Sequence, residues 1–396
     1  MKRTPLARKN LIERPSRTVV SALGIAFAIV LMFMQLGFLG AVGDTATLVY
    51  RRTPADLIIR SPEYLQTFDP RSLDVDIVPL VKAIPEVLDV RTLDLGITRW
   101  QNPITGEMRA IAIMGVDPSR PALDLPVLKE PSPILNSANH VLIDDATRFD
   151  YGPQNGKYFS DLDIGIDTDV TGKRVVIGGV FEMGTGLAAN GALLMSHDAF
   201  RRLAPDRMTL PSGSRRVSML IVRLREGVPV MEGQLTIANR ITMLGGSLSS
   251  AQVLTLEEAK NAERWHWYVR TPIGIIFGIG VALAVIVGGV ICYMVLAADV
   301  IAKLPEYATL KALGYSNSFL VKTLLGQAAW LAGAAFPPAV IASLTLYAIT
   351  SFFAGVPITM TTERIMLVAL LSFSMCTAAG WIALRKMTKA EPANLF

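Results

Sequence analysis

Four kinds of motif in this sequence could support chemistry, and the first is a glycine-rich run. Residues 184–189, GTGLAA, follow a strand-like stretch and match the G-x-G-x-x-A pattern of dinucleotide-binding proteins. Such a site would also need a helix that opens at this run and an acidic residue about 20 positions further on. The bare pattern often matches by chance, and we interpret the run as a glycine-rich turn.

The second kind of motif is a P-loop for ATP, and its pattern G-x-x-x-x-G-K-[ST] does not occur in the sequence. The pairs Gly156-Lys157 and Gly172-Lys173 lack the surrounding pattern and the hydroxyl residue that should follow. We therefore predict that this chain does not hydrolyse ATP and that any ATPase is a separate subunit. We expect no cofactor.

The third candidate is a calcium loop made of Asp161, Asp163, Asp167 and Asp169. An EF-hand loop needs a glutamate at its twelfth position, and the twelfth position from Asp161 is Gly172. The alternation of aspartates with apolar residues is better explained by a strand at 160–169 with one solvated face.

The fourth candidate is a histidine-based or serine-based centre. His140, His197 and His266 are far apart, with no H-E-x-x-H pattern and no cysteine partner. The run at 245–249, GGSLS, narrowly misses G-x-S-x-G and has no strand-to-helix elbow around it. We predict no catalytic residue and no metal site, so the chain is not expected to be an enzyme.

The elements that would position any site belong to a membrane protein. Hydrophobic residues make up 51% of the 396 residues and charged residues 18%, with a mean hydropathy of +0.42. The hydrophobic share and the mean hydropathy lie above those of ordinary soluble domains, and the charged share lies below. Four runs are long and apolar enough to span a bilayer, and we expect transmembrane helices at 18–43, 271–298, 323–354 (kinked near Pro337) and 365–384.

The distribution of charge orients these helices. Residues 44–270 contain 28 acidic and 25 basic residues, a net charge of −3, whereas the whole chain carries +5. The excess positive charge therefore lies in the N-terminal segment, the loop at 299–322 and the C-terminal tail. By the positive-inside rule these are cytoplasmic, and residues 44–270 are extracytoplasmic. This distribution excludes a nucleic-acid-binding role and places the chain in the cell's inner (plasma) membrane.

The extracytoplasmic segment reads as an α/β domain with a strand-rich insertion. Strand and helix signals alternate at about 50–125 and 215–255, and short strands with turns fill about 135–212. Both cysteines, Cys292 and Cys376, fall in predicted spans, so the domain has no disulfide. The complete division is 1–17 basic N-terminus, 18–43 helix 1, 44–270 external domain with the insertion at 135–212, 271–298 helix 2, 299–322 coupling loop, 323–354 helix 3, 355–364 external loop, 365–384 helix 4 and 385–396 tail.

A short polar segment between the second and third spans, residues 304–316 (LPEYATLKALGYS), has the signals of a surface helix. A proline suits the first helical turn, an acidic residue there and a basic residue in the last turn match the helix dipole, and a glycine can end the helix. Either a docking helix or an ordinary turn fits these signals. The residues concerned are Pro305, Glu306, Tyr307, Thr309, Leu310, Lys311, Gly314 and Tyr315.

Small residues four apart in the second span permit close helix approach, within the chain or across a homodimer. They are Gly274, Gly278 and Ala282, with Gly280, Ala284 and Gly288 on an adjacent face. In the first span Gln35 is the one strongly polar residue, and we expect it to face another helix.

Five stretches resemble the MacB/FtsX-like ABC transporter permeases, and more narrowly the DevC-type permeases of tripartite glycolipid exporters. They are GIAFAIVLMFMQLGF (24–38), WQNPITGEMR (100–109), TPIGIIFGIG (271–280), LPEYATLKALGYS (304–316) and AEPANLF (390–396). The polar segment at 304–316 carries the most specific part of this resemblance.

The resemblance implies a homodimer with a separate ABC ATPase subunit bound to residues 304–316 in the cytoplasm. It further implies a membrane-fusion protein outside, a TolC-like outer-membrane channel, and relay of ATP-driven motion to the external domain for export of a lipid, glycolipid or other hydrophobic cargo. The alternative is an FtsX-like regulator that activates an extracytoplasmic enzyme without transport. A membrane-anchored enzyme is a third interpretation, and no set of active-site residues in the sequence supports it.

Overall fold

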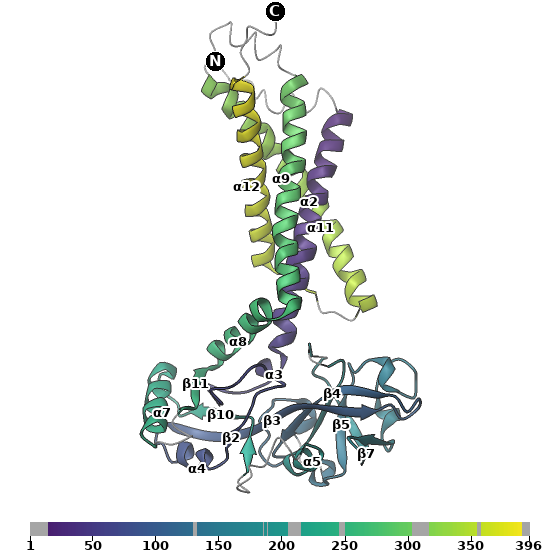
Figure 1. Cartoon of the computed structure of the whole chain (residues 1–396), viewed down its shortest axis with the longest axis vertical. Coiled ribbons are helices and arrows are strands. Elements are labelled where there is room, and N and C mark those ends of the chain that lie inside the picture. Colours follow the sequence, from purple (N-terminus) through teal and green to yellow (C-terminus); the bar gives the residue numbers. More distant parts are fainter. Residues whose placement is uncertain are drawn as a thin grey trace, which may run out of the picture. The chain divides into compact units, whose positions relative to one another are not determined.

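The structure is a computed structural model that describes residues 15–129, 133–184, 186–187, 189–204, 215–244, 250–302, 317–354 and 358–389. Its contacts divide the chain into a helical unit, residues 1–41 and 271–396, and an α/β unit, Val42–Arg270. The chain therefore passes between the two units twice, after Ala41 and after Arg270. Figure 1 shows the elements of both units.

Long apolar helices form the described part of the helical unit: α2 (Pro15–Ala46), α9 (Pro272–Ala302), α11 (Asn317–Ala354) and α12 (Thr362–Lys389). Each contains a stretch that is long and apolar enough to cross a membrane: Val19–Ala46, Pro272–Ala298, Leu325–Phe353 and Thr362–Ile382. A helix satisfies its own backbone hydrogen bonds, which lipid cannot do. The predicted fold class, four membrane helices with a large α/β domain, is confirmed, and the bounds of the predicted divisions remain predictions.

Contacts at small residues hold these helices together. The Tyr347 hydroxyl of α11 donates a hydrogen bond to the Phe33 carbonyl of α2. Gly37 makes room for the same ring, because a Cβ there would lie 2.5 Å from the Tyr347 hydroxyl oxygen. Gln35 lies against Gly280 of α9, as expected of a polar residue in a membrane helix.

A nine-stranded mixed sheet runs through the α/β unit in the order β11-β1-β10-β3-β4-β8-β5-β7-β6, and a two-stranded sheet pairs β2 with β9. The strands are β1 (Leu57–Arg60), β2 (Leu73–Asp74), β3 (Val87–Gln101), β4 (Met108–Val116), β5 (His140–Asp144), β6 (Asp167–Val170), β7 (Lys173–Phe181), β8 (Ala192–Ser196), β9 (Arg216–Val217), β10 (Met219–Leu224) and β11 (Gln252–Thr255).

The helices of this unit are α3 (Leu48–Arg51), α4 (Ile77–Lys82), α5 (His197–Leu203), α7 (Val230–Leu244) and α8 (Leu256–Trp265), followed by a π-helical turn, His266–Arg270. Short 3₁₀ turns lie at Pro126–Leu128, Pro133–Asn136, Phe149–Tyr151 and Asp161–Asp163. The start of α8 is fixed by a capping box between Thr255 and Glu258.

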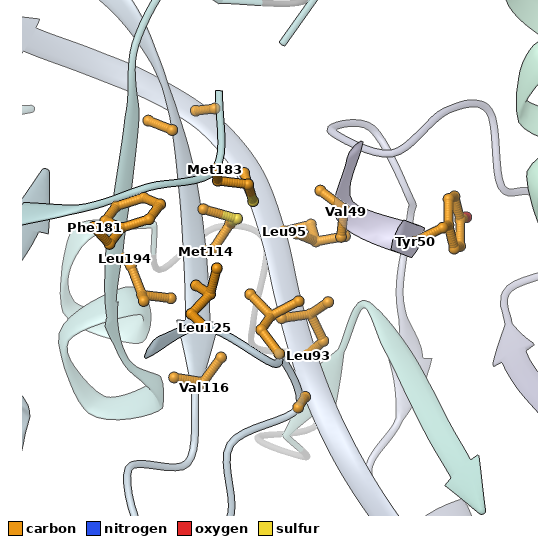
Figure 2. Packing of buried hydrophobic residues seen from close by; sticks show 14 of the residues in the cluster. Val49, Tyr50, Leu93, Leu95, Met114, Val116, Leu125, Phe181, Met183 and Leu194 are labelled. Atoms are coloured by element: carbon orange, nitrogen blue, oxygen red, sulfur yellow. The ribbon is translucent and has the colours of Figure 1, made fainter. Parts of the chain in front are cut away.

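Three buried apolar clusters form the core of the α/β unit. One lies with β1, β10, α4 and α7, and another with β5, β7, β8 and α5. A third, shown in part in Figure 2, joins Val49 of α3 and Leu95 of β3 to Met114 of β4, Leu194 of β8 and Met183. Because apolar burial is the main stabilising term of folding, this third cluster fixes α3 to the middle of the sheet.

The strand-rich part predicted at about 135–212 does not form a sheet of its own. Its strands β5, β6, β7 and β8 continue the sheet of the first part through the parallel pairing of β8 with β4. The β3–β4 hairpin reaches across: Leu93 belongs to the third cluster, whereas Trp100, seven residues further on, lies in the cluster with β5 and β7. A long twisted strand can supply side chains to two cores, which short-range sequence patterns do not reveal.

Candidate functional site: a buried carboxylate joint

The predicted docking residues lie outside the part of the chain that the structure describes. They fall between the end of α9 at Ala302 and the start of α11 at Asn317, and they are Pro305, Glu306, Tyr307, Thr309, Leu310, Lys311, Gly314 and Tyr315. The serine-rich run at 245–249 also lies outside the described residues.

The predicted packing face of α9 is only partly used within the chain. Gly274 is buried, but a Cβ on Gly278 would have no neighbour within 4 Å, and Ala282 is exposed. The adjacent face does the packing instead: a Cβ on Gly288 would lie 2.6 Å from Met375 Sδ of α12. Close helix approach through Gly278 and Ala282, within the chain or across a homodimer, stays a prediction.

None of the described residues of the glycine-rich run, Gly184, Gly186, Leu187 and Ala189, lies in a helix. Gly184 has a φ of +103°, which suits glycine, and its N–H donates to Asp144 Oδ2 at 2.9 Å. The described residues that follow lead into β8 instead of a helix. Asp144 is fully buried and also accepts from the N–H groups of Ala146 and Met183.

Burial raises the pKa of Asp144 to about 7, with a smaller contribution from Asp145. Between pH 3.8 and about pH 7 the folded protein then binds more protons than the unfolded chain, so stability falls as pH rises through this window.

We expect Asp144→Asn to remove this pH dependence of stability, which amounts to at most about 1.4 kcal/mol for each pH unit. Free energies of unfolding for both proteins at about pH 5 and about pH 8 check it. The exposed Asp161→Asn is the control, and parallel curves for wild type and Asp144→Asn would contradict the prediction.

The aspartate series is not a single strand. Asp161 and Asp163 lie in a 3₁₀ turn, and only Asp167 and Asp169 belong to β6. Asp163 is buried because its carboxylate accepts from the N–H groups of Gln154 and Ser160, so it shapes the turn. Among the described residues no group of three or more His, Cys, Asp or Glu side chains could hold a metal ion.

The structure gives His197 partners that the sequence analysis missed. Its Nδ1 lies 2.6 Å from Asp94 Oδ2, and its Nε2 lies 2.9 Å from the Thr92 hydroxyl. Since a carboxylate only accepts, Nδ1–H donates to Asp94 and the hydroxyl donates to Nε2. Asp94 is buried and also accepts from the Ser218 N–H. The group joins β3 to the first residue of α5. The spacing of Thr92 and Asp94 on one face of a strand was the available signal.

A second buried carboxylate, Glu263 of α8, lies where the α/β unit meets its two connections along the chain. Only 1% of Glu263 is exposed. Its Oε2 accepts from the Tyr64 hydroxyl at 2.6 Å, and its Oε1 accepts from the Thr67 N–H at 2.9 Å and from the Trp267 indole N–H at 3.1 Å. Three donors compensate the loss of water around this carboxylate.

The network extends to the other connection through Tyr50 of α3, whose hydroxyl lies 2.8 Å from that of Tyr64. Burial, together with the charge of Glu263, raises the pKa of Tyr50. Burial likewise raises the pKa of Tyr64, with smaller effects of Tyr50 and Glu263. Both phenols therefore stay protonated and can donate. The Arg60 guanidinium lies 4.0 Å from the centre of the Tyr64 ring and places a positive charge beside the network.

Close backbone approach accompanies these bonds. A Cβ on Gly43 would lie 2.0 Å from the Tyr268 hydroxyl oxygen, so the end of α2 and the π-helical turn touch where glycine leaves space. Short π-helical segments occur often at functional positions. The Thr47 hydroxyl in the same segment donates to the Gly43 carbonyl at 3.0 Å.

We name the group Tyr50, Tyr64, Thr67, Glu263 and Trp267 the carboxylate joint. It binds the segment that follows α2 to the segment that precedes α9 inside one rigid core. The Trp267 indole N–H donates to Glu263 four residues earlier in the chain. The spacing of Glu263 and Trp267, four residues apart just before a membrane span, was the signal that could have indicated a pair.

Residues 275–392 match the model of the FtsX-like permease C-terminal domain. The matched residues include most of α9 and all of α11 and α12, and they support the FtsX-like part of the resemblance for this part of the chain. No curated protein matches the chain.

The solved structures that are similar to about half of the chain include two extracytoplasmic domains of transporters. The extracellular domain of the noncanonic ABC-type transporter YknZ from Gram-positive bacteria has 13% identity and a TM-score of 0.35, and the match covers 51% of this chain and 99% of that one. The periplasmic region of MacB from Actinobacillus actinomycetemcomitans has 8% identity and a TM-score of 0.35, with 54% and 94% covered. No residue's role is transferred from either.

Proposed function

We propose that the chain is the membrane subunit of an ABC transporter, a permease that works with an ATPase on a separate chain. The observation that carries this proposal is the match of residues 275–392 to an FtsX-like permease domain. The sequence supports the need for a partner, because it contains no P-loop pattern.

In this function α9 is the element that carries motion. Its C-terminal end leads into the segment 304–316, which docks on the ATPase. Its N-terminal end follows the π-helical turn and α8, which is held in the α/β unit by Glu263. A displacement of α9 is then passed to a core that also holds the segment after α2. The hydrogen-bonded residues around Glu263 would transmit this displacement, because coupling between distant parts of a protein is carried by packed side chains and hydrogen-bond networks.

The finer assignment is a DevC-type exporter in a tripartite system. It comprises a homodimer in the inner (plasma) membrane with both termini in the cytoplasm, a membrane-fusion protein and a TolC-like channel outside, and a lipid, glycolipid or other hydrophobic cargo. The resemblance of the five stretches named above supports it. The match to an FtsX-like domain equally favours the second candidate, a regulator that activates an extracytoplasmic enzyme and exports nothing.

Partners crosslinked in native membranes and identified by mass spectrometry distinguish these candidates. An exporter is expected to capture an ABC ATPase together with a fusion protein. An ATPase together with a cell-wall hydrolase, and no fusion protein, would support the regulator. Capture of neither ATPase nor fusion protein would contradict the proposed function.

Substitution in the docking segment tests the residues themselves. We expect Glu306→Arg and Tyr307→Ala to lower co-purification of the ATPase and its stimulated ATP turnover several-fold, because the first reverses a charge at the helix N-terminus and the second removes an apolar anchor. Unchanged values for both variants would show that 304–316 does not dock.

Cysteine labelling tests the orientation. Tyr158 is 65% exposed in the α/β unit, so Tyr158→Cys should react with an impermeant maleimide from outside. Ser316→Cys should react only after the membrane is opened. Ser160 is a poorer reporter, because its side chain belongs to a capping box with Asp163. The opposite pattern of labelling would reverse the topology.

A further inference from the structure

The only two cysteines in the sequence meet inside the helical unit. Cys292 lies in α9 and Cys376 in α12, 84 residues apart along the chain, and their Sγ atoms are 3.2 Å apart. Both side chains are fully buried and belong to the apolar cluster of this unit. A disulfide has an S–S distance of about 2.05 Å, so the two sulfurs have to approach by only about 1 Å.

The helices around the pair are in close register. Gly288 and Gly289 of α9, one turn before Cys292, lie against Met375, the residue next to Cys376. One turn after it, a Cβ on Gly380 of α12 would lie 3.6 Å from Leu296 of α9. The pairing thus advances by four residues on both helices, from Cys292 and Cys376 to Leu296 and Gly380. The two helices therefore run in the same direction, and sliding one past the other by one turn, about 5.4 Å, would separate the thiols.

We propose that Cys292 and Cys376 form a redox-active dithiol whose oxidation to a disulfide locks α9 to α12. The oxidant is an uncharged organic hydroperoxide, the class that forms on unsaturated acyl chains and can enter an apolar site. The disulfide would fix the position of α9 along α12. Because α9 continues from α8 and the carboxylate joint, it would also restrain the segment that leads from α9 to the α/β unit.

The chemistry balances in two steps. In the first, one cysteine sulfur attacks the outer peroxide oxygen, the O–O bond breaks, and the thiol proton passes to the departing alkoxide, giving a sulfenic acid and an alcohol. In the second, the other thiol attacks that sulfur, the S–S bond forms, the S–O bond breaks, and water leaves. The two sulfurs together lose two electrons and the peroxide gains them. A dithiol reductant reverses the change by exchange.

The test uses the full chain in lipid nanodiscs exposed to cumene hydroperoxide, then denatured and alkylated with N-ethylmaleimide. The intact mass should fall by two hydrogens with no label bound, a peptide linked through Cys292 and Cys376 should appear, and dithiothreitol should restore two labels. Cys376→Ser should stop at the sulfenic acid on Cys292, which dimedone traps. Retention of both labels in the wild type, or disulfides only between molecules, would overturn the proposal.

A matched control moves one thiol by a turn. The double variant Cys376→Ser with Gly380→Cys keeps two cysteines in α9 and α12, and its thiols should oxidise at least ten-fold more slowly than the wild-type pair. Equal rates would show that contact is not what drives the reaction. Oxidised wild type should also unfold at a higher temperature than the reduced protein, with no such shift in Cys292→Ala/Cys376→Ala. No shift in the wild type would contradict the lock. None of these measurements needs the ATPase.

Discussion

Glu263→Ala is expected to destabilise the α/β unit by more than about 3 kcal/mol, because it removes a buried carboxylate that accepts three hydrogen bonds. The bonds lost are those from the Tyr64 hydroxyl, the Thr67 N–H and the Trp267 indole N–H. For a unit of this size the loss corresponds to a fall in melting temperature of roughly 6–12 °C. Thermal unfolding of the full chain measures it, with hydrogen exchange to localise the loss.

Two variants make the Glu263 result specific. Glu263→Gln keeps an acceptor for Thr67 and Trp267, and its amide can donate to the Tyr64 oxygen, so it should cost less than about 1 kcal/mol. Glu257 lies on the same helix with a side chain that is 70% exposed, and Glu257→Ala should change stability by no more than about 0.5 kcal/mol. If Glu263→Ala unfolds at the temperature of Glu257→Ala, the carboxylate does not bind the two connecting segments together.

Hydrogen exchange of Glu263→Ala tests whether the joint couples the two connecting segments. In Glu263→Ala the amides of 256–270 and 48–51 should exchange faster together, because Tyr50 reaches the carboxylate through Tyr64. Faster exchange in only one of the segments would show that the joint does not couple them, and the route proposed for motion from α9 would then end at α8.

Trp100→Ala should have an effect of similar size, about 3–5 kcal/mol, because it removes a large buried ring and leaves a cavity. Trp100 has no exposed surface, its indole N–H donates to the Tyr151 carbonyl at 3.0 Å, and its ring stands edge-on to Phe159. Chemical unfolding measures the total loss. Hydrogen exchange should show the greatest loss of protection in β5 and β7, which share its core.

The control for Trp100 is Trp265→Ala, since 61% of Trp265 is exposed. Its cost should stay near the range of ordinary surface substitutions, about 0.5 kcal/mol. If Trp100→Ala loosened β1 and β10 as much as β5 and β7, the hairpin β3–β4 would not divide its side chains between two cores as the structure indicates.

The carboxylate joint and the proposed disulfide both restrain helix α9. Glu263 holds the segment that leads into α9, and Cys292 lies within α9 itself. The joint before α9 can pass on motion only if α9 can shift relative to α12. A disulfide between α9 and α12 would prevent that shift. Substitutions at Glu263 and at the two cysteines therefore test one idea, that α9 is the element that moves in the proposed function.

The sequence alone determined the membrane helices, because a span of about 20 apolar residues has few alternatives in water or in lipid. It also predicted that Gln35 faces another helix, because a polar side chain in a membrane span needs a partner there. The sequence did not decide which face of α9 packs against other helices. Two sets of small residues, one with Gly278 and one with Gly288, both follow the four-residue spacing.

Only the tertiary structure decided which distant residues meet. Glu263 finds Tyr64 and Thr67 across almost 200 positions, His197 finds Thr92 and Asp94 across about 100, and Cys292 finds Cys376 across 84. Periodicity reports which side of a helix or strand is apolar, but not which element covers it. The partner is set by the order of strands in the sheet and the register of α9 against α12. For that reason the candidate site is visible in the fold and not in the motifs.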